Sequence, residues 1–299
     1  MSSTHTDLQA RRYGPDAFGD DIRRFVNLTL TLATTDFKLT YFGSALGYVW
    51  SLIRPLLFFG VLYVVFTQIF GVGTGVPFYS VQLLVAIILW TFFLQATSGC
   101  VQCLLAREGL LRKMRFPRLV IPLAVGLTAL FQLATNLIPI IIFALAAGVT
   151  PKIAWLEIVP LVGLLALFAV GIGMLLSVLF VRFRDIQPIW DVTAQVLFYA
   201  SPIIYPVYKY ERALPAGSGP PPDIHLGAIG HLLMVNPIAT IIAQARHALV
   251  GGTQGANPSA SAALGGGQFV LIPLAIVAFV FILGVWVFNR EAPRISENL

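Results

Sequence analysis

Residues 80–118 read SVQLLVAIILWTFFLQATSGCVQCLLAREGLLRKMRFPR. The first part, residues 80–105, is longer than the roughly 20 apolar residues that a helix needs to cross a hydrocarbon layer of about 30 Å. The second part is basic and ends at Pro117 and Arg118. This order predicts a transmembrane helix followed by a loop on the cytoplasmic side of the membrane.

The rest of the chain repeats the same alternation of apolar runs and short polar connections. The chain is 58% hydrophobic and only 11% charged, whereas a soluble domain carries about 25% charged residues. Because lipid cannot satisfy backbone hydrogen bonds, each apolar run is expected to be a helix. We predict an all-α integral membrane protein with six spans, at about residues 47–70, 80–105, 119–147, 155–181, 189–205 and 269–288.

The basic residues predict the orientation of these spans. With both termini inside, 15 of the 19 lysines and arginines lie on the cytoplasmic side, which is the bias that orients membrane proteins. We therefore expect a cytoplasmic N-terminus (residues 1–46), a six-span domain (residues 47–289) and a cytoplasmic tail (residues 290–299). The polar N-terminus lacks the apolar core of a cleaved signal peptide. The 15 residues are Arg11, Arg12, Arg23, Arg24, Lys38, Arg54, Arg107, Arg112, Lys113, Arg115, Arg118, Arg182, Arg184, Arg290 and Arg294.

Two further segments are predicted to be helical without crossing the membrane. Residues 20–37 have an amphipathic pattern, which favours a helix lying flat on the inner leaflet. Its apolar face would contain Ile22, Phe25, Val26, Leu30, Ala33 and Phe37. Residues 206–268 are predicted to form one or two short helices that lie at the outer interface or dip back into the protein. The rival topology makes this segment a seventh span and moves the C-terminus outside.

The sequence predicts neither catalytic residues nor a metal site or other cofactor. Cys100 and Cys103 form a C-x-x-C inside a span, without the βαβ context of a redox motif. No lysine is followed by Ser or Thr, so the chain has no P-loop for ATP. Nucleic acid is not an expected partner, because the basic residues lie in short loops beside apolar runs. The histidines have no metal-binding spacing: His5, His225, His231 and His247.

Aromatic residues on and after the fifth span are candidates for lining a channel. Trp190, Phe198, Tyr199 and Tyr205 offer ring faces that can stack on sugars. The alternative is an ordinary aromatic belt at the outer interface. Among the acidic residues, only Glu157 and Asp191 fall within the spans, near their ends. This pattern argues against a proton- or sodium-coupled transporter, which needs a chain of buried ionisable groups.

Five segments, in this order and spacing, resemble ABC-2 type permeases, most closely those that export O-antigen, teichoic acid, galactan and related lipid-linked polysaccharides. The segment TTDFKLTYFGSALGYVWSLIRPLL (residues 34–57) resembles the entry to their first span, and LLRKMRFPRLVIPL (residues 110–123) resembles their coupling helix. The others are residues 181–189, 201–206 and 236–252. Two positions depart from the family pattern, with Thr40 in place of a basic residue and Arg54 in place of a polar amide.

The resemblance implies a permease subunit that is not itself an enzyme. Two copies of the chain would surround a channel in the bacterial plasma (inner) membrane, above two copies of a separate ABC ATPase that binds ATP and Mg. The cargo would be a polyprenyl-linked polysaccharide. The implied site residues are Arg107, Glu108, Arg112, Lys113, Arg115, Phe116, Pro117 and Arg118 for coupling to the ATPase; Arg23, Arg24, Asp36, Lys38 and Tyr41 for the N-terminal interface; Arg184 and Asp185 for an inner-face turn; and Trp190, Phe198, Tyr199 and Tyr205 for the channel.

Two other functions are consistent with the apolar pattern. The same fold could export a drug, lipid or other small amphiphile. A membrane enzyme acting on polyprenyl phosphate is a third hypothesis, but it requires convergent carboxylates or histidines. The cytoplasmic loops offer only the isolated Glu108 and Asp185 for such chemistry.

Overall fold

The computed structural model describes residues 22–41, 47–73, 75–109, 117–205, 207, 228–251 and 257–298. Within these ranges the chain forms helices and turns and no strand, as the sequence predicts. Five of the described helices are long and apolar enough to cross a membrane, and each matches a predicted span. They are Val49–Ile69, Tyr79–Val101, Val120–Ala146, Ile153–Arg182 and Gly267–Glu291.

The remaining predicted span, residues 189–205, is a shorter helix. This helix, α9 (Ile186–Ala200), has 15 residues and is therefore about 22 Å long, less than the roughly 30 Å of a hydrocarbon layer. It ends before Ser201, and the residues that follow form turns. Six spans therefore require α9 to cross together with these turns, and the six-span count stays a prediction.

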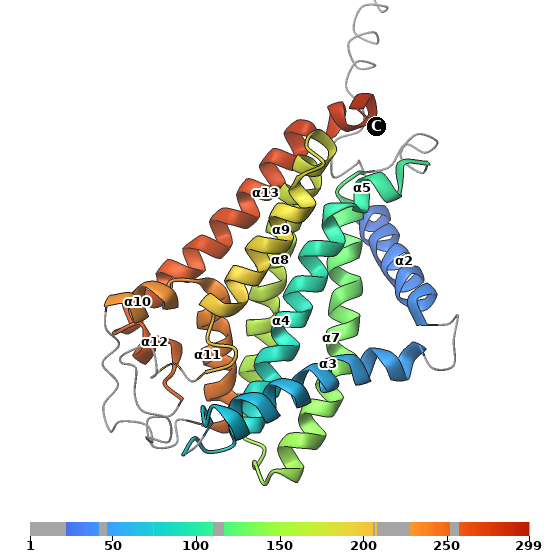
Figure 1. The fold of residues 1–299 in the computed structure, drawn as a ribbon. Coiled ribbons are helices and arrows are strands. Elements are labelled where there is room, and N and C mark those ends of the chain that lie inside the picture. Colours follow the sequence, from blue (N-terminus) through green and yellow to red (C-terminus); the bar gives the residue numbers. More distant parts are fainter. Residues whose placement is uncertain are drawn as a thin grey trace, which may run out of the picture.

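Helix α4 (Tyr79–Val101) lies at the centre of the bundle (Figure 1). Large apolar side chains are fully buried around it, including Leu83, Ile87 and Phe93. Its neighbours are α7 (Val120–Ala146), α8 (Ile158–Arg182), α9 and α11 (Pro237–Val250). The long apolar run that predicted a span thus forms the core of the protein, with little of its surface left for lipid.

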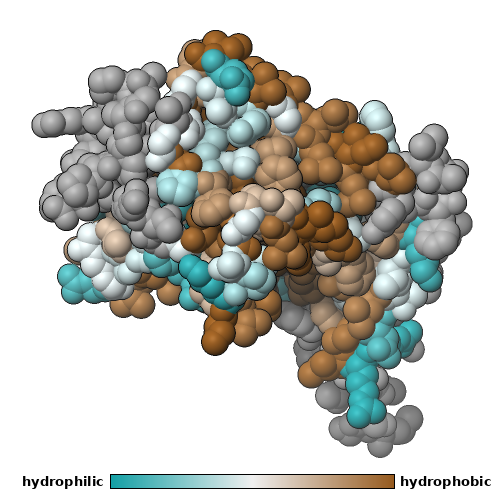
Figure 2. Space-filling model, turned by 90° about the horizontal axis from the view of Figure 1, so that it is seen from below, coloured by the Kyte–Doolittle hydropathy of each residue, from teal (hydrophilic) through white to brown (hydrophobic). Residues whose placement is uncertain are grey.

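The outward faces of the longer helices are apolar and exposed. Ile142 of α7, Val159 of α8, and Phe279 and Ile282 of α13 (Leu271–Asn298) are between 63% and 72% exposed. Figure 2 shows broad apolar areas on the face seen from below. Contiguous apolar surface of this kind is rare on soluble proteins. The protein is a multi-pass membrane protein, and these faces are those suited to contact lipid.

The helices α8 and α13 approach each other closely at two glycines. A Cβ atom added to Gly171 would lie 2.8 Å from the Cα atom of Phe281, and one added to Gly284 would lie 2.5 Å from the carbonyl oxygen of Gly171. Small residues allow such backbone contact between membrane helices, where dispersion forces drive packing. Helix α13 continues to Asn298, so residues 290–298 of the predicted tail extend this helix rather than forming a separate segment.

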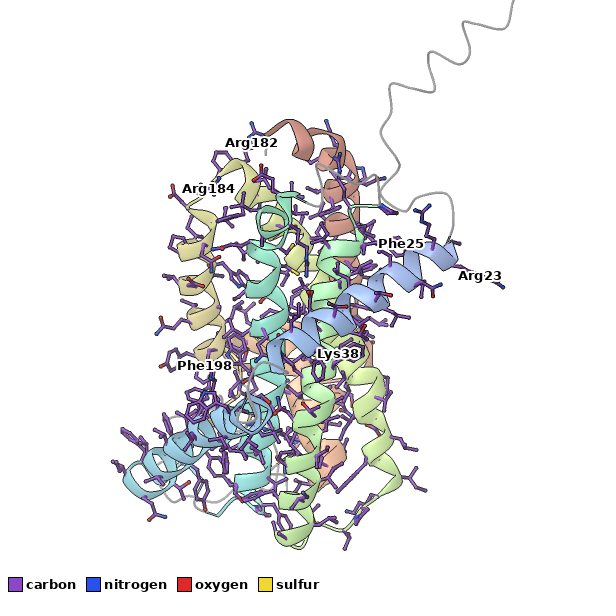
Figure 3. The ribbon with its side chains drawn as sticks, turned by 90° about the vertical axis from the view of Figure 1, so that its right-hand side faces the viewer. Arg23, Phe25, Lys38, Arg182, Arg184 and Phe198 are labelled. Atoms are coloured by element: carbon purple, nitrogen blue, oxygen red, sulfur yellow. The ribbon has the colours of Figure 1, made fainter. Side chains whose placement is uncertain are left out.

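The amphipathic helix α2 (Ile22–Tyr41) packs obliquely along α7 instead of standing apart from the bundle. Figure 3 shows it running from Arg23, at the end farther from the bundle, to Lys38, over the middle of the bundle. The Phe37 ring meets the Phe131 ring of α7 edge-on at 5.8 Å, and Ala33 is fully buried. The predicted apolar face is therefore divided. Phe25, Ala33 and Phe37 face the protein, while Ile22, Val26 and Leu30 are exposed.

The first transmembrane segment, α3 (Gly47–Val64) followed by a π-helical turn (Val65–Ile69), is strongly inclined to the other long helices (Figure 1). It is also the least buried of the five candidate spans. Its inner-facing side chains Pro55 and Phe59 are buried, and Phe59 contacts Phe143 of α7 at 5.6 Å. This inclination leaves space between α3 and α9.

The outer segment dips back into the protein, which was one of its two predicted arrangements. It forms α10 (Ala228–Met234), α11, α12 (Ala260–Ala263) and a 3₁₀ turn (Gly267–Val270). Asn236 caps α11 by accepting a hydrogen bond from the Ile238 N–H at 3.1 Å, and Pro237 occupies the first turn. No described helix in this segment is long enough to be a seventh span, since α11 has 14 residues.

Arg246 holds α11 in place. Only 3% of this residue is exposed, and its guanidinium donates to the carbonyl oxygens of Gln82 (3.2 Å), Tyr205 (3.3 Å) and Ile203 (2.6 Å). The guanidinium stays protonated in proteins and must be hydrogen-bonded when buried. Arg246 therefore joins the outer ends of α4 and α9 to α11, a role that its place outside the predicted spans did not indicate.

Replacing Gly171 with Ala should destabilise the protein by about 1–3 kcal/mol, because the new methyl group forces α8 and α13 apart. The measurement is the apparent unfolding temperature in detergent. Gly163→Ala, in the same helix, is the matched control, since nothing lies within 4 Å of its added Cβ. That variant should unfold at the wild-type temperature or slightly above it. An equal fall in both variants would contradict the close backbone contact.

Candidate functional site

A chamber of about 930 Å³ lies between α3, α4, α7 and α9, and Thr40 of α2 also lines it. Its wall combines aromatic rings with polar side chains. Phe198 is at the centre of the aromatic part, with its ring 5.5 Å from Trp90, 6.1 Å from Phe58 and 5.2 Å from Tyr199. Trp50 of α3 completes the aromatic lining. The rings come from three different helices, so the chamber exists only in the folded bundle.

Polar residues line the same chamber at helical spacing. On α4 they are Thr91 and Gln95, on α7 Gln132 and Asn136, and on α9 Asp191 and Gln195. The members of each pair are four residues apart and so share one face of their helix. The side-chain amides of Gln95, Gln132, Asn136 and Gln195 make no hydrogen bond to any residue that the structure describes. Water or a bound ligand must therefore satisfy these amides.

A second cavity of about 480 Å³ adjoins the chamber. The two cavities share Leu94, Gln95, Gln132 and Asp191 as lining residues. The second cavity extends to Asp36 of α2 and to Ser98 of α4. Together the cavities form a polar route between α2 and the aromatic chamber, through an otherwise apolar bundle.

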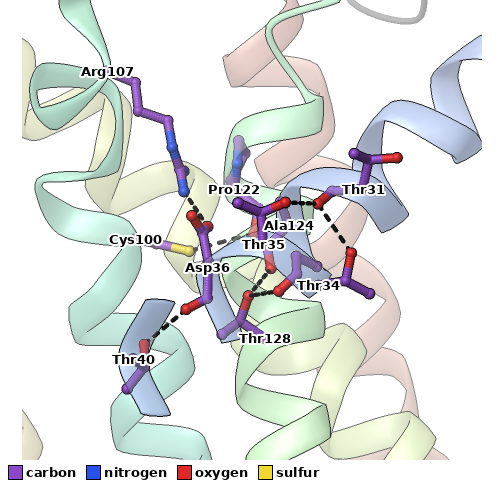
Figure 4. Close-up of polar contacts among 11 residues, drawn as sticks. Thr31, Thr34, Thr35, Asp36, Thr40, Cys100, Arg107, Pro122, Ala124 and Thr128 are labelled. Atoms are coloured by element: carbon purple, nitrogen blue, oxygen red, sulfur yellow. Dashed lines mark hydrogen bonds and ion pairs between the residues drawn. The ribbon is translucent and has the colours of Figure 1, made fainter. Parts of the chain in front are cut away.

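An ion pair joins α2 to the segment that follows α5 (Cys103–Ala106). The Asp36 carboxylate contacts the Arg107 guanidinium, and both side chains are largely buried (Figure 4). On the other side, the Thr128 hydroxyl of α7 donates to the Ala33 carbonyl at 3.3 Å. The sequence placed Asp36 and Arg107 in two separate sites, and the structure brings them together at the inner end of the polar route.

The other candidate residues of the inner face lie at different places. Arg23, Arg24 and Lys38 are exposed along α2. The exposed Arg184 lies over the Phe180 ring at 5.7 Å, and Asp185 is exposed at the start of α9. Glu108, Pro117 and Arg118 are half-buried, and burial lowers the pKa of the Arg118 guanidinium. Arg112, Lys113, Arg115, Phe116 and the side chain of Tyr41 lie outside the described residues.

The four predicted channel aromatics divide into two groups. Phe198 and Tyr199 line the chamber, and Tyr199 is 58% exposed. Trp190 is buried beside α4 and donates its indole N–H to the Ser98 hydroxyl at 3.1 Å. Tyr205 donates its hydroxyl to the Tyr199 carbonyl at 2.7 Å. Trp190 and Tyr205 are thus not among the chamber's lining residues.

Sequence reasoning did not identify most of the chamber. It missed Trp90, Phe58 and the amides. Trp50 was only part of the segment that resembles the family's first span, and Arg54 was named for the charge bias and as a departure from the family pattern. The amides carried a usable signal, because Gln132 and Asn136, four residues apart within a long apolar run, indicate a polar helix face. The aromatic residues carried none, since apolar runs contain many rings that only pack.

An all-helical membrane protein with an aromatic and polar chamber between its spans has the features of a membrane transporter subunit. The sequence model of the ABC-2 type transporter family matches residues 27–216, more than half of the chain. The chain therefore belongs to the ABC-2 type transporter family. It is a transmembrane permease subunit, and ABC-2 permeases work with an ABC ATPase partner.

Named relatives agree with this assignment. The chain is 26% and 27% identical to two O-antigen export system permease proteins RfbA of Klebsiella pneumoniae, over 276 and 277 residues. Each alignment covers 91% of this chain and 95% of the relative. An O-antigen export system permease protein RfbA of Myxococcus xanthus is 28% identical over 189 residues, which are 62% of this chain and 71% of that protein.

Replacing Asp36 with Asn should lower the stability of the permease by about 1–2 kcal/mol, because Arg107 then stays half-buried without its counter-charge. The same loss is expected for Arg107→Gln. The double variant Asp36→Arg/Arg107→Asp should recover part of the loss, which measures the coupling between the two residues.

The control for this pair is Lys38→Gln, which removes an exposed charge from the same helix. Its unfolding temperature in detergent should match that of the wild type. If Asp36→Asn and Lys38→Gln behaved alike, the ion pair would contribute nothing to stability.

Proposed function

We propose that this permease exports a polyprenyl-linked polysaccharide from the cytoplasm to the outer face of the membrane. The observation that carries the proposal is the chamber wall, where unpartnered amides lie beside aromatic rings. A sugar presents an apolar ring face and a rim of hydroxyl groups. Rings such as Phe198 and Tyr199 can stack on the face, while Gln95, Gln132 and Gln195 can bond the hydroxyls. A small apolar molecule would leave these amides unsatisfied.

The relatives support the same cargo class, since the named ones are O-antigen export permeases. An amide can donate or accept and thus suits many hydroxyl patterns. A wall of this kind therefore fits a long chain of repeating sugars that passes through without one tight site. O-antigen, teichoic acid and galactan chains are all members of this class.

Two copies of the permease form the channel in this proposal. The support comes from the exposed apolar residues beside the chamber, Leu57 and Val61 on α3 and Val192 and Val196 on α9, which are 57–63% exposed. A second copy that covers these rows would close the chamber. The α9 segment then completes six spans, and the positive-inside bias places both termini in the cytoplasm of a bacterium, at its inner membrane.

Two copies of an ABC ATPase supply the energy and bind ATP and Mg. The basic residues 107–118 and the helix α2 form the contact with the ATPase, and the Asp36–Arg107 ion pair links these two parts. A displacement of either part is therefore transmitted to the other. Because Asp36 also lines the second cavity, this displacement alters the end of the polar route near α2.

Depletion of the permease in its native cells tests the function directly. We expect one lipid-linked glycan to accumulate with its sugars facing the cytoplasm, as measured by extraction after labelling from the outside. Re-expression of the protein should remove it. Cells that need the protein but accumulate no glycan would instead favour the export of a drug, lipid or other small amphiphile.

Replacing both Gln95 and Gln132 with Leu should reduce glycan export at least about tenfold, because the wall loses two groups that bond sugar hydroxyls. The unfolding temperature should not fall, since neither amide bonds the described protein. The matched control is Gln268→Leu, the same change at an exposed position outside the chamber. Normal export by the double variant would show that the chamber does not contact the glycan.

A further inference from the structure

Arg54 is the one basic residue among the described residues that line the chamber. It lies on α3, and the same face of this helix presents Trp50 and Ser51, four and three residues earlier, and Phe58, four residues later. The side chain of Arg54 is exposed to the chamber rather than packed in the protein. The inclination of α3 thus directs a guanidinium beside the aromatic rings.

No described carboxylate forms an ion pair with Arg54. Asp191, on the facing helix α9, lines the same chamber, but among the described residues it is bonded only to Gln187 of its own helix, at 3.4 Å. A guanidinium within the span of a membrane protein is costly unless water or an anion surrounds it. Arg54 therefore offers five N–H donors and a full charge to whatever enters the chamber.

The two cavities differ in the basic residue that each offers. Arg54 lines the chamber and not the adjoining cavity, whereas Asp191 lines both. At the far end of the adjoining cavity, the Asp36 carboxylate already has Arg107 as its counter-charge. An anion can therefore contact the Arg54 guanidinium in the chamber, and this difference favours the Arg54 side.

We infer that Arg54 makes the chamber a recognition site for an anionic group of the cargo, a phosphate or a carboxylate. The planar guanidinium suits both groups because it can bond two of their oxygens at once. Trp50, one turn earlier on the same face, is placed to stack on the adjoining sugar ring. This inference rests on the proposed function and names the chemistry of its cargo. The anion belongs either to the pyrophosphate of the lipid carrier or to an acidic sugar of the glycan.

The binding test uses the full chain in lipid nanodiscs, with the fluorescence of Trp50 and Trp90 in the chamber wall as the readout. Four probes form two matched pairs: farnesyl pyrophosphate with farnesol, and a glucuronate oligosaccharide with a neutral glucose oligosaccharide of equal length. We expect the wild type to bind at least one anionic probe more tightly than its neutral match. Arg54→Gln should lower the affinity for that anionic probe about tenfold or more, and leave the affinity for the neutral probe unchanged.

Three further variants sharpen the test. Arg54→Lys keeps the charge but loses the paired donors, so its affinity should fall between those of the wild type and Arg54→Gln. Arg182→Gln, the same substitution at an exposed position outside the chamber, should bind as the wild type does. Asp191→Asn keeps Arg54 intact and should raise the affinity for the anionic probe about threefold, because it removes a negative charge from the chamber wall.

The pair of probes separates the two sources of the anion. If Arg54→Gln weakens the binding of farnesyl pyrophosphate, the anion belongs to the lipid carrier. If it weakens the binding of the glucuronate probe, the anion belongs to the glycan. The inference is overturned if Arg54→Gln binds both anionic probes normally, or if Arg182→Gln loses as much affinity. The depletion experiment described above tests the polysaccharide cargo separately. Glycan accumulation together with normal binding by Arg54→Gln would reject this site and keep the proposed function.

Discussion

The side-chain amides of Gln95, Gln132, Asn136 and Gln195 lie inside a bundle that is otherwise built from apolar residues, and they lack hydrogen-bond partners among the described residues. Burying such groups in a dry interior would cost several kcal/mol, so the helices around them cannot close into a solid core. The inclined α3, the short α9 and the cavity between them all meet this requirement. The bundle is consequently hollow on the side of α3 and α9, while α8 and α13 are in close backbone contact at Gly171 and Gly284.

The two ends of the bundle are held by different means. At the outer end, Arg246 is buried and bonded to three carbonyl groups that belong to fixed parts of the backbone. At the inner end, the Asp36–Arg107 pair joins two side chains, one from α2 and one from the segment before the basic loop. Carbonyls of a folded backbone cannot turn away, whereas side chains can exchange partners with little change in the fold. The inner end is thus the one suited to rearrangement.

The sequence predicts those features of the fold that depend on length and apolar character. The helices α4, α7, α8 and α13 follow from their apolar runs. Two features depend on tertiary packing and could not be predicted. The apolar residues of α2 form adjacent rows, and only the contact with α7 decides that Ala33 and Phe37 are covered while Val26 is not. Likewise, the sequence counts Arg54 among the basic residues of the cytoplasmic side, and only the tilt of α3 places it in the chamber.

The contact of Gly171 with Gly284 has a mechanical consequence. Two helices whose backbones touch cannot slide or rotate against each other without a clash, because no flexible side chain lies between them to adjust. The helices α8 and α13 therefore form a single rigid unit. Any widening of the chamber has to come from the opposite wall, where α3 is inclined, little buried and joined to α2. The parts suited to movement therefore lie on the side of α2 and α3, and the stationary parts lie on the side of α8 and α13.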